Sequence, residues 1–256
     1  MRSSLPTLAV LLICGWVGAC SAQPDGHSKV QIVASYPHDS RAFTQGLLIA
    51  DGELFESTGQ YGQSSVRRID LDTGRVEQST ALPDPYFGEG LALVGQRLYQ
   101  LTWKSGVVFV YDRQSLDRVG RLEYAGQGWG LTYDGRDLIM SDGSATLKRI
   151  DPTDFSVLGT IHVTEDGRPI EQLNELEYID GEIWANIWFS ERIVRIDPDS
   201  GQVIASLDAS ALKRALPPGG SPDVLNGIAW DAASGRLYLT GKYWSRLFEV
   251  RTPRAE

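Results

Sequence analysis

The 256-residue sequence is poor in cysteine and histidine, with only 2 Cys and 3 His. A disulfide scaffold is therefore excluded, and a zinc site built from these residue types is not expected. The sequence contains an internal repeat, described below, and His27, His38 and His162 do not fall at equivalent positions of its copies. The sequence also has no Gly-x-Ser-x-Gly nucleophile turn. We accordingly expect neither a catalytic metal nor another cofactor.

Positive charge is also scarce, because 24 Lys and Arg stand against 33 Asp and Glu, for a formal net charge of −9. Binding to nucleic acid needs a basic face, so a nucleic-acid partner is not expected. Beyond the N-terminal segment, no run approaches the roughly 20 apolar residues of a membrane-spanning helix. The 42% hydrophobic and 22% charged residues are typical of a globular protein.

The N-terminal residues 1–22 have the pattern of a secretory signal. Arg2 precedes an apolar run, Leu8–Val17, that is too short to cross a bilayer as a helix. The segment Val17-Gly18-Ala19-Cys20 then resembles a bacterial lipobox, whose cysteine is lipidated after cleavage. Ordinary cleavage near Ala22 is the alternative.

These observations predict an exported protein that is periplasmic or anchored in the cell envelope through a lipid on Cys20. Its contact with a membrane would be limited to that lipid. Cys14 lies in the apolar part of the signal, so the mature chain would contain no pair of thiols. Residues 23–256 are expected to form a single catalytic domain, as a monomer.

A short segment with a glycine followed by an aliphatic residue recurs five times at intervals of roughly 45 residues. The equivalent positions are Gly46, Gly90, Gly130, Glu175 and Gly227. The fourth copy has glutamate instead of glycine, so the repeat does not fix the register of Glu175 and Glu177.

Each copy is followed by a turn and further apolar runs. Asp-Gly pairs, such as Asp51-Gly52 and Asp134-Gly135, are strong hairpin signals. About four antiparallel strands per unit predict an all-β fold, a five-bladed β-propeller. Only residues 209–216 have a helical pattern. The first strand, Val30–Tyr36, is expected to pair with Leu247–Arg251 and thus complete the last blade.

The first strand of each blade lines the axis of a propeller, so the residues before the repeated positions should meet there. They are Gln45, Glu89, Trp129, Asn174 and Asn226. The second strands should return to the same mouth. Their predicted ends are Gly59, Trp103, Gly143, Trp188 and Lys242. One carboxylate, several amides, a lysine and several indoles suit a small polar ligand held away from water.

Among the tryptophans, Trp103 and Trp129 are expected to line this pocket, whereas Trp184 and Trp230 are expected to pack between blades. Glu89 is the candidate acid, because removal from water raises the pKa of a carboxyl group toward the range useful for proton transfer. The alternative is an ion pair with Lys or Arg. Lys242 is the candidate oxyanion stabiliser or partner of Glu89, and a solvated rim lysine is its alternative.

Several motifs together resemble the plant and bacterial glutaminyl cyclase family of five-bladed propellers, from about Val30 to Val250. They include Phe43-Thr44-Gln45-Gly46-Leu47, Gly88-Glu89-Gly90-Leu91, Leu101-Thr102-Trp103, Leu173-Asn174-Glu175-Leu176-Glu177 and Leu225-Asn226-Gly227-Ile228-Ala229. The resemblance implies an aminoacyltransferase that converts N-terminal glutamine of peptides and proteins to pyroglutamate, releases ammonia and uses no catalytic zinc. It also implies that Glu89 is the catalytic acid. The sequence departs from the family at Gln127, where glutamate is common.

The cyclisation chemistry assigns further expectations to the ring. Lys242, Asn226 and Gln45 are candidate donors to the oxyanion. Asn174 and Trp103 are expected to hold the substrate, together with Trp129 and Trp188. Two other functions remain open. A propeller hydrolase or lactonase would place Ca²⁺ among several axial carboxylates, whereas this ring has one. A non-catalytic module of the cell envelope would bind a ligand or partner without releasing ammonia.

Overall fold

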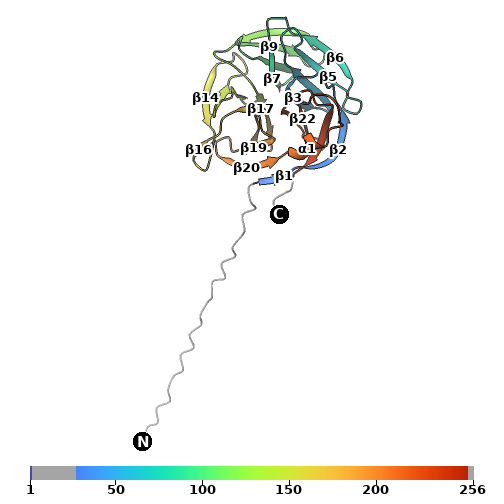
Figure 1. The fold of residues 1–256 in the computed structure, drawn as a ribbon. Coiled ribbons are helices and arrows are strands. Elements are labelled where there is room, and N and C mark those ends of the chain that lie inside the picture. Colours follow the sequence, from blue (N-terminus) through green and yellow to red (C-terminus); the bar gives the residue numbers. More distant parts are fainter. Residues whose placement is uncertain (2–26, 253–256) are drawn as a thin grey trace.

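The computed structural model describes Met1 and residues 27–252. Five β-sheets of four or five strands each are arranged as blades around a central axis (Figure 1). One short helix, α1 (Ser210–Arg214), lies within the predicted helical stretch. The five-bladed all-β prediction is confirmed. The predicted signal and Cys20 lie outside the described residues, apart from Met1.

In the first four blades, four antiparallel strands follow one another in sequence from the axis outward, and in the fifth blade β2 takes the outermost place after three such strands. The first blade comprises β3 (Thr44–Ala50), β4 (Glu53–Thr58), β5 (Ser65–Ile69) and β6 (Val76–Ala81). The second comprises β7 (Gly88–Val94), β8 (Arg97–Thr102), β9 (Val107–Asp112) and β10 (Arg118–Glu123). The third comprises β11 (Leu131–Tyr133), β12 (Leu138–Met140), β13 (Thr146–Ile150) and β14 (Val157–His162). The fourth blade comprises β17 (Leu173–Ile179), β18 (Glu182–Ile187), β19 (Arg192–Ile196) and β20 (Val203–Asp208). The fifth comprises β21 (Leu225–Asp231), β22 (Arg236–Gly241), β23 (Arg246–Arg251) and β2 (Gln31–Pro37). A small hairpin, β15 (Thr164–Glu165) and β16 (Arg168–Pro169), follows β14.

The two ends of the described chain close the ring. Strand β2 pairs with β23 in antiparallel register from Gln31–Arg251 to Pro37–Arg246, as predicted (Figure 1). A shorter strand that the sequence did not signal, β1 (His27–Lys29), runs parallel to β20 of the fourth blade. The N-terminal segment therefore ties together the last two blades, which closes the ring at the point where the chain begins and ends.

Close approach of the inner strands explains the repeated glycines. A Cβ atom on Gly130 would lie 2.0 Å from the carbonyl oxygen of Asn174, and one on Gly90 would lie 2.5 Å from the nitrogen of Leu131. Only glycine allows neighbouring backbones to approach this closely.

In the fourth blade the position equivalent to these glycines is Glu175, and its side chain has a different role. One carboxylate oxygen accepts a hydrogen bond from the Leu47 nitrogen at 3.3 Å, and the other accepts one from the Ile228 nitrogen at 2.9 Å. The side chain thus links β17 to the inner strands of the first and fifth blades. Burial, together with the nearby charge of Glu177, raises the pKa of Glu175 well above its usual range.

The hydrophobic core lies between facing blades. Trp184 and Ile179 of the fourth blade pack with Leu225 and Leu237 of the fifth, and Trp230 packs against the same cluster. The predicted role of Trp184 and Trp230 between blades is confirmed.

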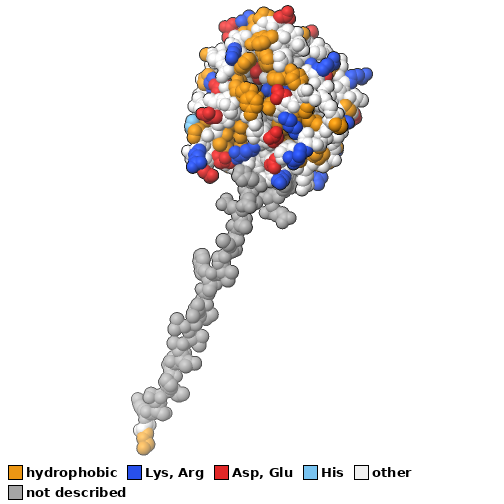
Figure 2. All heavy atoms as spheres, in the orientation of Figure 1, with side chains coloured by type: hydrophobic (Ala, Val, Ile, Leu, Met, Phe, Trp, Pro, Cys, Tyr) orange, Lys and Arg blue, Asp and Glu red, His pale blue; other side chains and the backbone are white. Residues whose placement is uncertain are grey.

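On the face shown in Figure 2, Lys and Arg side chains are interspersed with Asp and Glu. Within residues 27–252, no helix has the length and apolar character needed to cross a membrane.

The second strands end close to their predicted positions in four blades, one residue before Gly59, Trp103, Trp188 and Lys242. The prediction for the third blade is wrong, because β12 ends at Met140, short of Gly143. The hydroxyl of the next residue, Ser141, accepts a hydrogen bond from the Gly130 nitrogen and donates one to the Asn174 carbonyl. The backbone of Ser141 still pairs with Gly130 and Trp129, so these side-chain bonds add a link from the third blade to the fourth where β12 ends.

Candidate functional site

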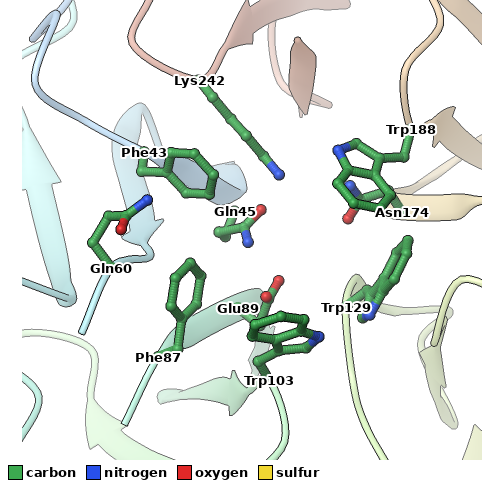
Figure 3. A pocket seen from close by; sticks show the side chains of 10 residues that line it. All are labelled: Phe43, Gln45, Gln60, Phe87, Glu89, Trp103, Trp129, Asn174, Trp188 and Lys242. Carbon is green, nitrogen blue, oxygen red and sulfur yellow. The ribbon is translucent and has the colours of Figure 1, made fainter. Parts of the chain in front are cut away.

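A cavity of about 210 Å³ opens at the axis, where the inner strands begin and the second strands end (Figure 3). Its lining residues are Phe43, Gln45, Gln60, Phe87, Glu89, Trp103, Trp129, Asn174, Trp188 and Lys242. Seven of the eight predicted site residues are therefore brought together. The exception is Asn226.

Asn226 lies behind the cavity, fully buried, and reaches it only through Gln45. Its side-chain nitrogen donates to the Gln45 side-chain oxygen at 3.3 Å and to the Thr44 carbonyl at 2.9 Å. The prediction that Asn226 lines the pocket is wrong, because these two hydrogen bonds hold its amide behind the cavity. The next residue, Gly227, also has a φ of +119°, which the equivalent Gly46, Gly90 and Gly130 do not share.

Glu89 lies near the floor of the cavity on β7 and is only 4% exposed. Burial raises the pKa of its carboxyl group well above the usual range, against the opposing effects of Lys242 and a hydrogen bond from Gln45. The side-chain oxygen of Gln45 accepts a hydrogen bond from Asn226, so the side-chain nitrogen of Gln45 is the group that faces Glu89. The three side chains form a chain of hydrogen bonds from Asn226 to the acid. This environment favours the protonated form of the Glu89 carboxyl group.

Lys242 is 3% exposed and reaches into the cavity from the end of β22 (Figure 3). Its ammonium nitrogen lies 4.6 Å from the centre of the Phe43 ring and 5.9 Å from that of Trp188. Burial lowers the pKa of Lys242, while the negative charges of Glu89 and Asp223 act against that shift. The alternative of a solvated rim lysine is therefore wrong. Lys242 is a buried amine that faces the same cavity as the acid.

Aromatic rings form the walls around these polar groups. Phe87 lies between Phe43 and Trp103, with ring centroids 5.8 Å and 5.7 Å apart, and Trp129 meets Trp188 edge-on at 5.2 Å. The placement of Trp103 and Trp129 in the pocket is confirmed.

Glycines at the mouth leave room for these rings. A Cβ atom on Gly59 would lie 2.3 Å from the Phe87 ring, and one on Gly143 would lie 2.5 Å from the Trp129 ring. These two residues do not line the cavity, but their lack of a side chain permits the aromatic wall.

Two buried polar atoms of the lining residues have no hydrogen-bond partner among the described residues. They are the side-chain oxygen of Asn174 and the indole nitrogen of Trp129. Buried polar atoms are nearly always paired, so such atoms in a cavity mark places where a ligand can supply the partner. The Asn174 amide faces the middle of the cavity (Figure 3). It is suited to accept a hydrogen bond from an N–H group of a ligand.

Gln127 supports the wall from behind. The Trp103 indole donates to the Gln127 side-chain oxygen at 3.1 Å, and the Gln127 nitrogen donates to the Asp142 carbonyl at 3.3 Å. A glutamate at this position would keep the first interaction and lose the second. The amide therefore fixes Trp103 without adding a charge beside the cavity.

Three lining residues were not predicted from the sequence: Phe43, Phe87 and Gln60. The two phenylalanines occupy equivalent places in the first two repeats, so the repeat itself carried a signal for them. Gln60 has a left-handed backbone (φ +94°) directly after Gly59, a geometry that the sequence does not reveal.

The acidic and histidine side chains of the described chain do not form a metal centre. Among residues 27–252, no group of three or more His, Cys, Asp and Glu side chains is placed to hold an ion.

Comparisons with known proteins agree with this arrangement. The sequence model of the family described as glutamine cyclotransferase matches residues 7–252. The chain is 46% identical over 232 residues to glutaminyl-peptide cyclotransferase of Arabidopsis thaliana. This alignment covers 89% of this chain and 72% of the plant protein. Its fold is similar to the crystal structure of Myxococcus xanthus glutaminyl cyclase, with a TM-score of 0.84 and 41% identity, over 90% of this chain and 99% of that one. All the lining residues fall inside the matched segment.

Proposed function

The chain belongs to the glutamine cyclotransferase family, and we propose that its axial cavity converts the N-terminal glutamine of peptides and proteins to pyroglutamate with release of ammonia. The observation that carries this proposal is a buried carboxyl group of raised pKa, Glu89, in a small cavity with aromatic walls. The cavity suits one uncharged amide side chain, while its open mouth leaves room for the rest of a peptide.

The reaction is an internal acyl transfer. The neutral α-amine of the substrate attacks the carbonyl carbon of its own side-chain amide, so that one C–N bond forms. The bond from that carbon to the amide nitrogen then breaks. One proton leaves the attacking amine and one is added to the departing nitrogen, which makes ammonia the leaving group. No redox step or cofactor is needed for the balance.

We assign the proton transfer to Glu89. A carboxyl group whose pKa lies close to the working pH can accept the proton of the attacking amine and deliver it to the leaving group. Such general acid–base catalysis typically contributes about 10²- to 10⁴-fold in rate. The hydrogen bond from Gln45 holds the carboxyl group in one orientation during both transfers.

Lys242 and Gln45 are the candidate donors to the oxyanion that forms when the carbonyl is attacked. Each donor placed in a site shielded from water stabilises this charge by about 3 kcal/mol. The Asn174 oxygen, which lacks a partner among the described residues, would accept a hydrogen bond from the α-amine or the side-chain amide of the substrate. The indole walls would then hold the two reacting atoms close together and exclude water.

The direct test is incubation of the purified protein with a short peptide that begins with glutamine. We expect a mass loss equal to one ammonia and stoichiometric ammonia in solution, with no change for the same peptide beginning with asparagine. A hydrolase would instead add the elements of water to its product. A binding module would retain the peptide unchanged, and either result would refute the proposal.

We also propose that the protein is exported and acts as a monomer, with membrane attachment only through a lipid on Cys20. The basic start, the apolar run and the lipobox-like segment support export. Labelling of a bacterial expression host with palmitate tests the anchor: wild type should carry the label and Cys20→Ala should not. Label on neither form would favour ordinary cleavage. Size-exclusion chromatography of the mature chain tests the monomer.

A further inference from the structure

An exposed aromatic side chain continues the wall of the cavity beyond its mouth. Phe189 is 73% exposed, and its ring stacks on that of Trp188 with centroids 4.1 Å apart and planes inclined by 25°. Trp188 itself lines the cavity. A ligand that leaves the cavity along Trp188 therefore meets Phe189 next.

The backbone of Phe189 is held in an unfavourable conformation. Its φ is +63°, in the left-handed region that bulky residues rarely adopt. The turn is fixed by hydrogen bonds from Ser190 to Ile187 (3.0 Å) and from Trp188 to Gln172 (2.8 Å), both between backbone groups. Glycine or asparagine would fit this position without strain. A strained and exposed aromatic beside a ligand cavity indicates a function rather than a contribution to stability.

A second exposed ring extends the opposite wall. Tyr61 is 53% exposed and meets Phe87 edge-on, with ring centroids 5.3 Å apart. Phe87 and Trp188 lie on opposite sides of the cavity (Figure 3). The mouth is thus bordered on two sides by apolar surface that the protein leaves in water.

The chemistry of the substrate decides what lies between these rings. The reacting glutamine is the first residue, and its carbonyl is joined to the second residue. Once the glutamine side chain occupies the cavity, the second residue must lie at the mouth. We propose that Phe189 forms a subsite for the side chain of this second residue, with Tyr61 on the other side, and that the subsite favours apolar and aromatic residues. This inference rests on the proposed function.

The physical basis is removal of apolar surface from water. Contact between an aromatic side chain and a partner ring strengthens binding about three- to tenfold. Because this contact is made equally in the bound substrate and in the transition state, its loss should raise KM and leave kcat unchanged.

The test compares peptides that begin with Gln-Phe and Gln-Gly, with wild type and Phe189→Asn. We expect wild type to favour the Gln-Phe peptide in kcat/KM, and Phe189→Asn to reduce that preference about three- to tenfold through KM alone. The Gln-Gly peptide should be turned over equally by both proteins. Since asparagine tolerates the left-handed conformation, the melting temperature should stay the same or rise.

Leu158→Asn is the matched control, because Leu158 is an exposed apolar residue (53%) on the outer strand β14, away from the mouth. The preference of this control variant for the Gln-Phe peptide over the Gln-Gly peptide should equal that of wild type. Phe189→Gly serves as the second variant if the asparagine form is unstable. An unchanged preference in a folded Phe189 variant overturns the inference, whereas failure of wild type to cyclise either peptide refutes the proposed function instead.

Discussion

Replacement of Glu89 by glutamine isolates the role of the buried acid, since the side chain keeps its shape and loses its proton. In the protein, Glu89 is 4% exposed and its pKa is raised mainly by burial. The variant removes a group that is costly to bury as an anion, so the free energy of unfolding should not fall. Turnover of a Gln-initiated peptide should fall by at least about 10²-fold, the lower limit of general acid–base catalysis. The loss should appear in kcat, because the substrate still fits the cavity.

The assay is ammonia release followed continuously, with thermal unfolding measured on the same samples. Glu175→Gln is the matched control, since Glu175 is also a buried carboxyl of raised pKa but holds the backbones of β3 and β21 instead of lining the cavity. Its amide nitrogen would oppose a backbone N–H, so this control should lose stability while keeping most of its kcat. A Glu89→Gln protein with activity within tenfold of wild type would refute the proton transfer assigned to Glu89.

Three further predictions address the support of the site, the stability of the fold and metal dependence. Asn226→Ala frees the amide of Gln45, and we expect kcat to fall about tenfold at nearly constant KM, measured by steady-state kinetics. His38 is buried, which disfavours its charge, but Glu56 at 3.1 Å outweighs this and raises the pKa of His38. The stabilisation from this pair is complete below about pH 6.5, the ordinary pKa of histidine, and is lost as the pH rises through the raised pKa. The free energy of unfolding of wild type, measured with urea, should therefore decrease as the pH rises through this range. His38→Gln should remove that dependence on pH. EDTA should leave turnover unchanged; loss that added metal restores would contradict the proposed chemistry.

The repeat made most of the fold predictable. Glycines at the axis and Asp-Gly turns recur because every blade meets the same steric demands: a Cβ atom on Gly130 would lie only 2.0 Å from a neighbouring carbonyl oxygen. The pairing of β2 with β23 followed from the need to close the ring. Strand β1 was not predicted, because a strand of three residues is too short to show an alternation of apolar and polar residues.

The site was predictable where the position in the repeat alone decides which way a side chain points. Glu89 and Asn174 satisfied that condition. Asn226 did not, because its amide is bonded to the Thr44 carbonyl and the Gln45 side chain behind the cavity, and the repeat does not encode these partners. Phe189 was missed for another reason: its left-handed backbone and its stacking on Trp188 arise from the turn, and neither leaves a pattern in the sequence.

The distribution of the site over the ring explains why a propeller suits this cavity. Gln45, Glu89, Trp129 and Asn174 come from the inner strands of four successive blades or from the residues just before them, and Asn226 of the fifth supports Gln45 from behind. No single blade contains both the acid and its supports. The position of Glu89 relative to Gln45 therefore depends on the packing of whole blades, which the pairing of β2 with β23 holds in a closed ring. Backbone glycines keep the inner strands close, so the functional side chains converge without leaving the axis open to water.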